Sequence, residues 1–197
     1  MKNKFLSGLA FIGLAVTLVS CEKAPQAEID LVKAAVDSAK VVGAATYQAE
    51  AFNALDDSLE SVLVKVEAEN GKMFPSYGDI KTELEAVKAQ AYQVIQQTET
   101  RKVEVKQEVE TLVTEVKTLV DQNKELLAKA PKGKEGKEAL EQINTEIATI
   151  ETSIGEIETL VGTGEFMAAH DKAKVSKENA SAINTELSTV IAKKAGR

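Results

Sequence analysis

The sequence predicts an all-α fold, an antiparallel up-down four-helix bundle or coiled coil, and three observations indicate it. The chain of 197 residues has no Trp, 4% aromatic residues and three Pro, a composition typical of long helices. Apolar residues recur at steps of three and four along most of the chain. Gly and Pro gather in short segments between these periodic runs, where they end helices.

The first 21 residues have the layout of an export signal. A head with Lys2 and Lys4 precedes the apolar run 5–19, which is shorter than a membrane-spanning helix needs to be. The run ends in Leu18-Val19-Ser20-Cys21. This stretch resembles the lipobox of bacterial lipoproteins, which has an aliphatic residue three before the cysteine and a small residue just before it.

The resemblance implies that residues 1–20 are a cleaved signal peptide and that Cys21 is the site of lipidation, with a diacylglyceryl group on its sulfur. Residues 21–26 would then be a lipidated tether to a helical domain over 27–197. Glu22, where retained lipoproteins have aspartate, implies the outer rather than the inner membrane. The alternatives are an ordinary cleaved signal peptide, which leaves a free thiol, and an uncleaved anchor helix.

The run 27–69 is expected to be the first helix. Its first half is rich in small residues such as Gly43-Ala44-Ala45, which let neighbouring helices approach but bury little area per contact. Its expected apolar stripe is Val32, Ala39, Val42, Thr46, Ala49, Leu59, Val62 and Val66.

The second helix is expected over 79–129, after a turn that Asn70-Gly71 opens. Its first stripe is Ile80, Leu84, Val87, Ala91 and Val94, and its second is Val105, Val109, Leu112, Val116, Leu119 and Leu126. Between the stripes, around Thr98 and Arg101, the spacing slips by an extra step of four. Such a stutter locally unwinds a coiled coil.

The third and fourth helices are expected over 137–161 and 164–194, on either side of Gly162-Thr163-Gly164. The third has a regular stripe of Leu140, Ile143, Ile147, Ile150, Ile154, Ile157 and Val161. Because the last two helices are shorter than the first two, we expect a four-helix base at the anchored end. A two-helix hairpin would project beyond this base, with bending of the long helices as the competing layout.

Two sets of residues are candidate contact sites. The up-down topology would bring basic residues to the anchored end, where they could contact anionic headgroups; the set is Lys129, Lys132, Lys134, Lys137, Lys193, Lys194 and Arg197. The alternative is that these lysines only suit helix C-termini. Met73, Phe74 and Tyr77 would form an apolar distal tip for a partner, or else fold back to close the hairpin.

No catalytic constellation is visible in the sequence. His170 is the one histidine, so neither a metal site nor a nucleophile–histidine pair is indicated, and no cofactor motif is present. The net charge of −7 argues against nucleic acid. We expect a non-enzymatic envelope lipoprotein that acts as a spacer or a platform for an envelope protein partner, with self-association as an option. The alternative is a ligand-binding or chaperone-like module for apolar cargo.

Overall fold

The computed structural model describes residues 23–131 and 136–195, and these residues form helices joined by short turns, with no strand among them. The helices are α1 (Gln26–Val41), α2 (Ala44–Tyr47), α3 (Ala49–Asn70), α4 (Gly78–Lys129), α5 (Lys137–Thr163) and α6 (Phe166–Ala195). The all-α prediction is confirmed. The ranges expected for the last three helices lie within two residues of α4, α5 and α6.

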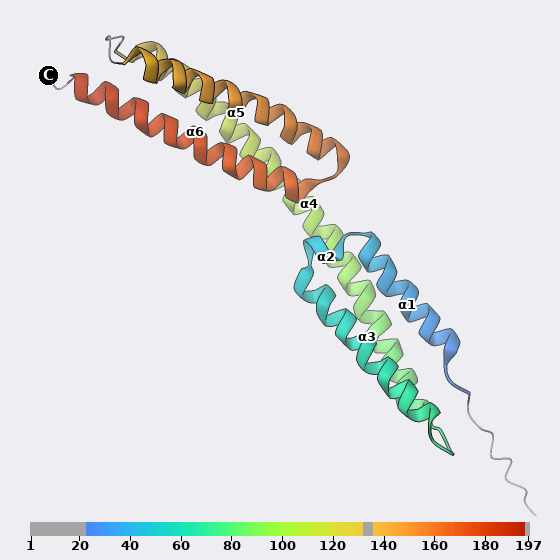
Figure 1. Cartoon of the computed structure of the whole chain (residues 1–197). Coiled ribbons are helices and arrows are strands. Elements are labelled where there is room, and N and C mark those ends of the chain that lie inside the picture. Colours follow the sequence, from blue (N-terminus) through green and yellow to red (C-terminus); the bar gives the residue numbers. More distant parts are fainter. Residues whose placement is uncertain (1–22, 132–135, 196–197) are drawn as a thin grey trace, which may run out of the picture.

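The helices form two bundles that lie end to end along α4 (Figure 1). The N-terminal bundle consists of α1, α2, α3 and the first half of α4, and the C-terminal bundle consists of the second half of α4 with α5 and α6. In each bundle, one partner helix runs parallel to α4 and one runs antiparallel to it. Because α4 has 52 residues, the rod is about 78 Å long at 1.5 Å per residue.

This arrangement differs from the expected four-helix base with a projecting hairpin. The expected first helix, 27–69, is broken, and α3 folds back beside α1 instead of continuing it. Gly43 has a φ of +84°, which ends α1 in the left-handed region. The N–H groups of Val42 and Gly43 bond to carbonyl oxygens of the last turn of α1, at 3.0 and 2.9 Å.

A phase slip in the apolar pattern explains why the break is required. Ala39 in α1 and Phe52 in α3 are both buried. On one continuous helix of about 100° per residue, their separation would rotate one by roughly 220° from the other, onto nearly the opposite face. The chain buries both only by turning back between them. Thr46 and Ala49, expected in one continuous stripe, are exposed as a result.

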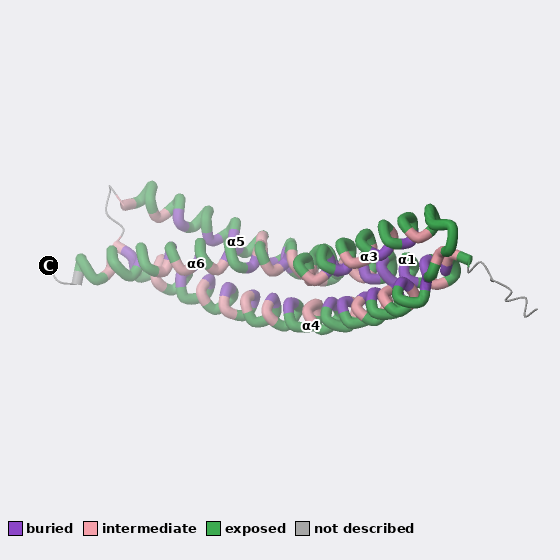
Figure 2. The backbone as a smooth tube through the Cα atoms, turned by 90° about the horizontal axis from the view of Figure 1, so that it is seen from below, coloured by how far each residue is buried: buried purple, intermediate pink, exposed green. Residues whose placement is uncertain are grey.

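Each bundle has a core of its own, formed on the inward faces of its helices (Figure 2). The N-terminal core combines small residues such as Ala39, Ala44 and Ala91 with Phe52 and Leu55. The C-terminal core is built from five isoleucines of α5 and aliphatic residues of α4 and α6; the α5 set is Ile143, Ile147, Ile150, Ile154 and Ile157. The two cores meet α4 on either side of the expected stutter, between Thr98 and Val105.

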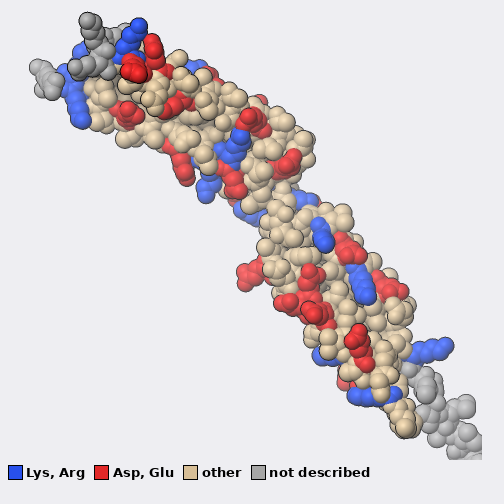
Figure 3. All heavy atoms as spheres, in the orientation of Figure 1, with Lys and Arg blue, Asp and Glu red and all other residues tan. Residues whose placement is uncertain are grey.

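Both signs of charge are interspersed over the visible face of both bundles (Figure 3). Several exposed ion pairs join neighbouring helices: Lys65–Glu83 at 2.7 Å, Lys117–Glu158 at 2.9 Å, Lys124–Glu151 at 2.6 Å and Lys177–Glu115 at 2.7 Å. Exposed pairs of this kind contribute about 0–1 kcal/mol each, so the apolar cores supply most of the stability.

Candidate functional site

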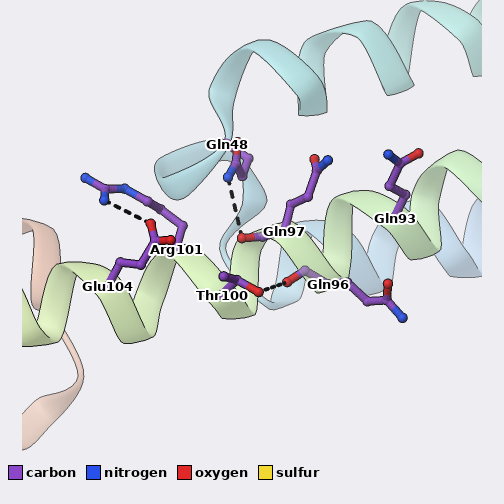
Figure 4. Close-up of a pocket in the computed structure, with 7 residues that line it drawn as sticks. All are labelled: Gln48, Gln93, Gln96, Gln97, Thr100, Arg101 and Glu104. Carbon is purple, nitrogen blue, oxygen red and sulfur yellow. Dashed lines mark hydrogen bonds and ion pairs between the residues drawn. The ribbon is translucent and has the colours of Figure 1, made fainter.

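The joint between the bundles, which we define as residues 96–108 of α4 with Gln48 and His170, carries an open groove (Figure 4). The groove is lined by Gln48, Gln93, Gln96, Gln97, Thr100, Arg101 and Glu104. Gln48 lies at the corner between α2 and α3, and its Nε2 donates to the carbonyl oxygen of Gln97 at 3.4 Å. Tyr47, beside it, has its ring 5.8 Å from Nζ of Lys102. These contacts brace the corner against α4.

On the C-terminal side of the joint, Glu108 connects α4 to α6. Its carboxylate accepts from Arg101 Nη1 at 2.8 Å and lies 3.3 Å from Nε2 of His170. The hydrogen bond from Arg101 lowers the pKa of Glu108 below its ordinary value, and the same contact raises the pKa of Arg101. This polar cluster lies beside the buried Val105, Val109 and Ala169, where the C-terminal core begins along α4.

The side chains of the joint form ion pairs and hydrogen bonds with one another. Nδ1 of His170 lies 3.5 Å from Asp171 Oδ1, so the imidazole is flanked by two carboxylates. Thr111, a hydroxyl residue in the adjoining groove, donates to Gln107 O at 3.0 Å and so is not paired with the imidazole. Within the described part of the chain, no three His, Cys, Asp or Glu residues are placed to hold a metal ion.

Of the three residues in the expected apolar tip, two are exposed and one is buried. Met73 and Phe74 are 84% and 70% exposed in the loop between α3 and α4. Tyr77 is 2% exposed and donates from its hydroxyl to Asn70 Oδ1 at 2.5 Å. Met73 and Phe74 are therefore available for contact, whereas Tyr77 closes the end of the N-terminal core, as the alternative interpretation had it.

The described basic residues, Lys129, Lys137, Lys193 and Lys194, lie at the opposite end of the rod from Lys23, where the described chain begins (Figure 1). Lys129 is in the last turn of α4 and pairs with Glu125 at 3.7 Å, and Lys137 begins α5 and pairs with Glu141 at 4.0 Å. Lys193 and Lys194 are exposed near the end of α6. The prediction that these residues lie at the end where the helical domain starts is wrong, because the first helix is not continuous: α3 runs back beside α1, so α4 ends far from the start of the described chain.

Four of the predicted site residues fall outside the described ranges: Cys21, Lys132, Lys134 and Arg197. Of the expected tether 21–26, residues 23–26 are described, and most of them belong to the folded bundle, so the tether is shorter than predicted. Ala24 packs against the N-terminal core, Pro25 is buried and α1 begins at Gln26.

Asn123 is a buried polar residue that the sequence analysis missed. It is fully buried in the C-terminal bundle, where Nδ2 donates to Ala180 O at 2.7 Å and Oδ1 accepts from Asn184 at 2.9 Å. The signal was present in the sequence, because Asn123 follows Val116 and Val120 in one helical row. A single asparagine in an apolar row fixes helix register at some cost in stability.

Among residues 23–131 and 136–195, no helix combines the length and apolar character that crossing a bilayer requires. Comparison with known proteins gives no relative: no family model, no curated protein and no solved structure matches this chain.

Proposed function

We propose that this protein is a lipid-anchored, non-enzymatic lipoprotein of the cell envelope that acts as a helical spacer or binding platform. Cys21 would carry the lipid, and the Glu22 that follows it favours the outer membrane over the inner. The rod would face the periplasm or the cell surface, and it would present its flanks and far end to another envelope protein.

The elongated shape, with the described chain starting at one end, is the observation that carries this proposal (Figure 1). An anchor at Cys21 would be two residues from Lys23, a distance of at most about 7 Å. The end of the N-terminal bundle would then lie at the lipid surface. A rod about 78 Å long, attached by one end, carries its other end far from the membrane.

The surface also supports a structural role over one in binding apolar cargo. The grooves at the joint are lined by polar and charged side chains, apart from Leu112, and they open to solvent. The largest apolar side chains are instead packed in the two cores. A module that carries apolar molecules needs an enclosed cavity, whereas both of these grooves are open to solvent.

The anchor is tested by mass spectrometry of the mature protein from membranes, beside a Cys21→Ser variant. We expect the wild-type chain to begin at Cys21 and to carry a diacylglyceryl group, and the variant to be absent from the membrane fraction. A mature chain that retains Met1, or that carries an unmodified thiol at Cys21, would refute the proposal.

The platform role is tested by crosslinking in cells from a photoreactive residue at position 193, which is exposed near the far end of the rod. We expect one envelope protein to be captured reproducibly, and the same residue in the Cys21→Ser variant to lose that product. Capture of a second copy of this chain would indicate self-association instead, and sedimentation of the purified protein would check it.

A further inference from the structure

We propose that Met73 and Phe74, the two residues of the apolar loop, form a second membrane contact that seats in lipid beside the anchor and holds the rod upright. This inference rests on the proposed lipid anchor, and it goes beyond it by assigning a lipid-binding site within the folded domain. The chemistry is that of a short apolar loop entering the headgroup and upper acyl region of a bilayer.

The position of the loop is the first argument. The loop between α3 and α4 and the start of the described chain at Lys23 lie at the same end of the rod in both Figure 1 and Figure 2. The apolar run 5–19 and Cys21 precede this point in the chain. The membrane attachment could be a lipid on Cys21 or the uncleaved apolar segment 5–19. In both cases, the end of the rod that carries Met73 and Phe74 would lie at the membrane.

The lack of slack between anchor and bundle is the second argument. Ala24 already packs against the N-terminal core and Pro25 is buried. Only Glu22 and Lys23 separate Cys21 from this packed segment, so the end of the bundle cannot move far from the bilayer. Because the end of the bundle stays close to the bilayer, lipid is the nearest apolar environment for the exposed side chains of Met73 and Phe74.

The loop is held in a shape that keeps these two side chains outward. Glu69 accepts a hydrogen bond from the backbone N–H of Ser76 at 3.2 Å and pairs with Lys72 on the other side of the apolar residues. The buried Tyr77 fixes the loop to α3 through Asn70. Because hydrogen bonds hold the loop on both sides of Met73 and Phe74, the loop loses little conformational entropy when these side chains enter lipid.

A lipid seat accounts for the exposure without a protein partner. A lipid anchor through a short tether fixes one point, and a rod attached at one point can tilt until it lies flat. A second contact at the same end restricts that tilt. The far end, with Lys137, Lys193 and Lys194, is then kept away from the bilayer and available to partners.

The test uses the acylated full-length mature protein with Phe74→Trp in phosphatidylcholine vesicles that contain lipids brominated on their acyl chains. The chain has no Trp, so the new indole is the one reporter. We expect its emission to shift to shorter wavelength on vesicle binding and to lose more than half of its intensity to brominated lipid.

Matched controls are Val103→Trp at mid-rod and Val190→Trp in α6, where the native side chains are 58% and 38% exposed. Neither should be quenched if the rod stands upright. Unquenched emission from Trp at position 74 in protein that floats with the vesicles would overturn the inference alone. Equal quenching at all three positions would mean a rod lying flat, which also overturns it. Failure of the acylated protein to float would overturn the anchor and the inference together.

Discussion

The two bundles share one helix but differ in how their helices run. The C-terminal bundle packs three unbroken helices around the isoleucine row of α5, and it contains a buried asparagine whose side chain donates to a backbone carbonyl of α6. The N-terminal bundle has a core with as many alanines as the C-terminal one, it includes the aromatic Phe52 and Tyr77, and it needs a sharp corner at Gly43. Apolar residues at one regular spacing produce straight helices, even where the buried residues are small, whereas a phase slip in the apolar pattern produces a folded-back pair.

The largest expected effect tests whether the two bundles are independent in stability. Leu55→Ala and Leu187→Ala each empty a fully buried site in one bundle, and each should cost about 2–5 kcal/mol there. We expect hydrogen exchange to accelerate across α1, α3 and the first half of α4 in Leu55→Ala, and across α5 and α6 in Leu187→Ala. Accelerated exchange throughout the rod in either variant would show that α4 makes the two bundles one cooperative unit.

A smaller effect is expected from the polar residue that distinguishes the C-terminal core. Asn123→Asp replaces the donor to Ala180 O by an acceptor and buries a carboxylate, which should cost about 1–3 kcal/mol or more. The matched control is Asn184→Asp, because Asn184 is only partly buried and donates to Asn123 Oδ1. Urea denaturation should rank the two variants in that order. Equal midpoints for both would argue against a register-fixing role for Asn123.

Glycine substitutions should have opposite signs in the two bundles. Gly43→Ala places a Cβ at a φ of +84° and 3.4 Å from the ring of Tyr47, so we expect a loss of about 1–2 kcal/mol. Gly155→Ala lies within α5 with open space around it, and it should gain roughly 0.5–1 kcal/mol. Thermal denaturation measures both. A stabilising Gly43→Ala would mean that the corner between α1 and α3 does not depend on this conformation.

The smallest effect concerns pH at the joint. Arg101 lowers the pKa of Glu108 in the folded state, so this contact contributes stability above the ordinary carboxyl pKa of 4.5. That contribution is lost as pH falls through the lowered pKa. Glu108→Gln should therefore be less stable than wild type at neutral pH and should lose part of the acid sensitivity. Parallel pH–stability curves for the two proteins would contradict this assignment.

The sequence predicted the helices of the C-terminal bundle better than those of the N-terminal bundle. In α5, the isoleucine row that the spacing indicated is the row that is buried, because one aliphatic stripe faces both neighbours. In the second half of α4, the predicted Leu112, Leu119 and Leu126 are only partly buried, and Val113, Val120 and Asn123 are buried instead. A helix that packs between two partner helices buries a wider face than one heptad row covers. The predicted leucine row and the buried row lie side by side on α4, and both face the partners.

The N-terminal bundle could not be predicted by the same reasoning. A run of small residues fits several stripes equally well, so the break at Gly43 was obscured by apparent continuity from Val42 to Ala49. The misplaced ends of the rod followed from that one error, since a continuous first helix reverses where Lys23 lies relative to the loop at Met73. The sequence indicated Met73, Phe74 and Tyr77 as apolar loop residues and left open whether they contact a partner or fold back. The exposure of Met73 and Phe74, and their place beside the start of the described chain, come from the structure.

A mechanical consequence follows from α4 being, among the described helices, the one with buried residues in both cores, while Tyr47 of α2 also packs against the C-terminal core. Three packed helices resist bending far more than a single helix does. A sideways load on the free end should therefore bend α4 mainly between Thr98 and Val105. The corner at Gln48 and the carboxylate of Glu108 lie on either side of that short span and limit how far it flexes. The protein should therefore behave as two stiff segments joined by a short, more flexible span of α4.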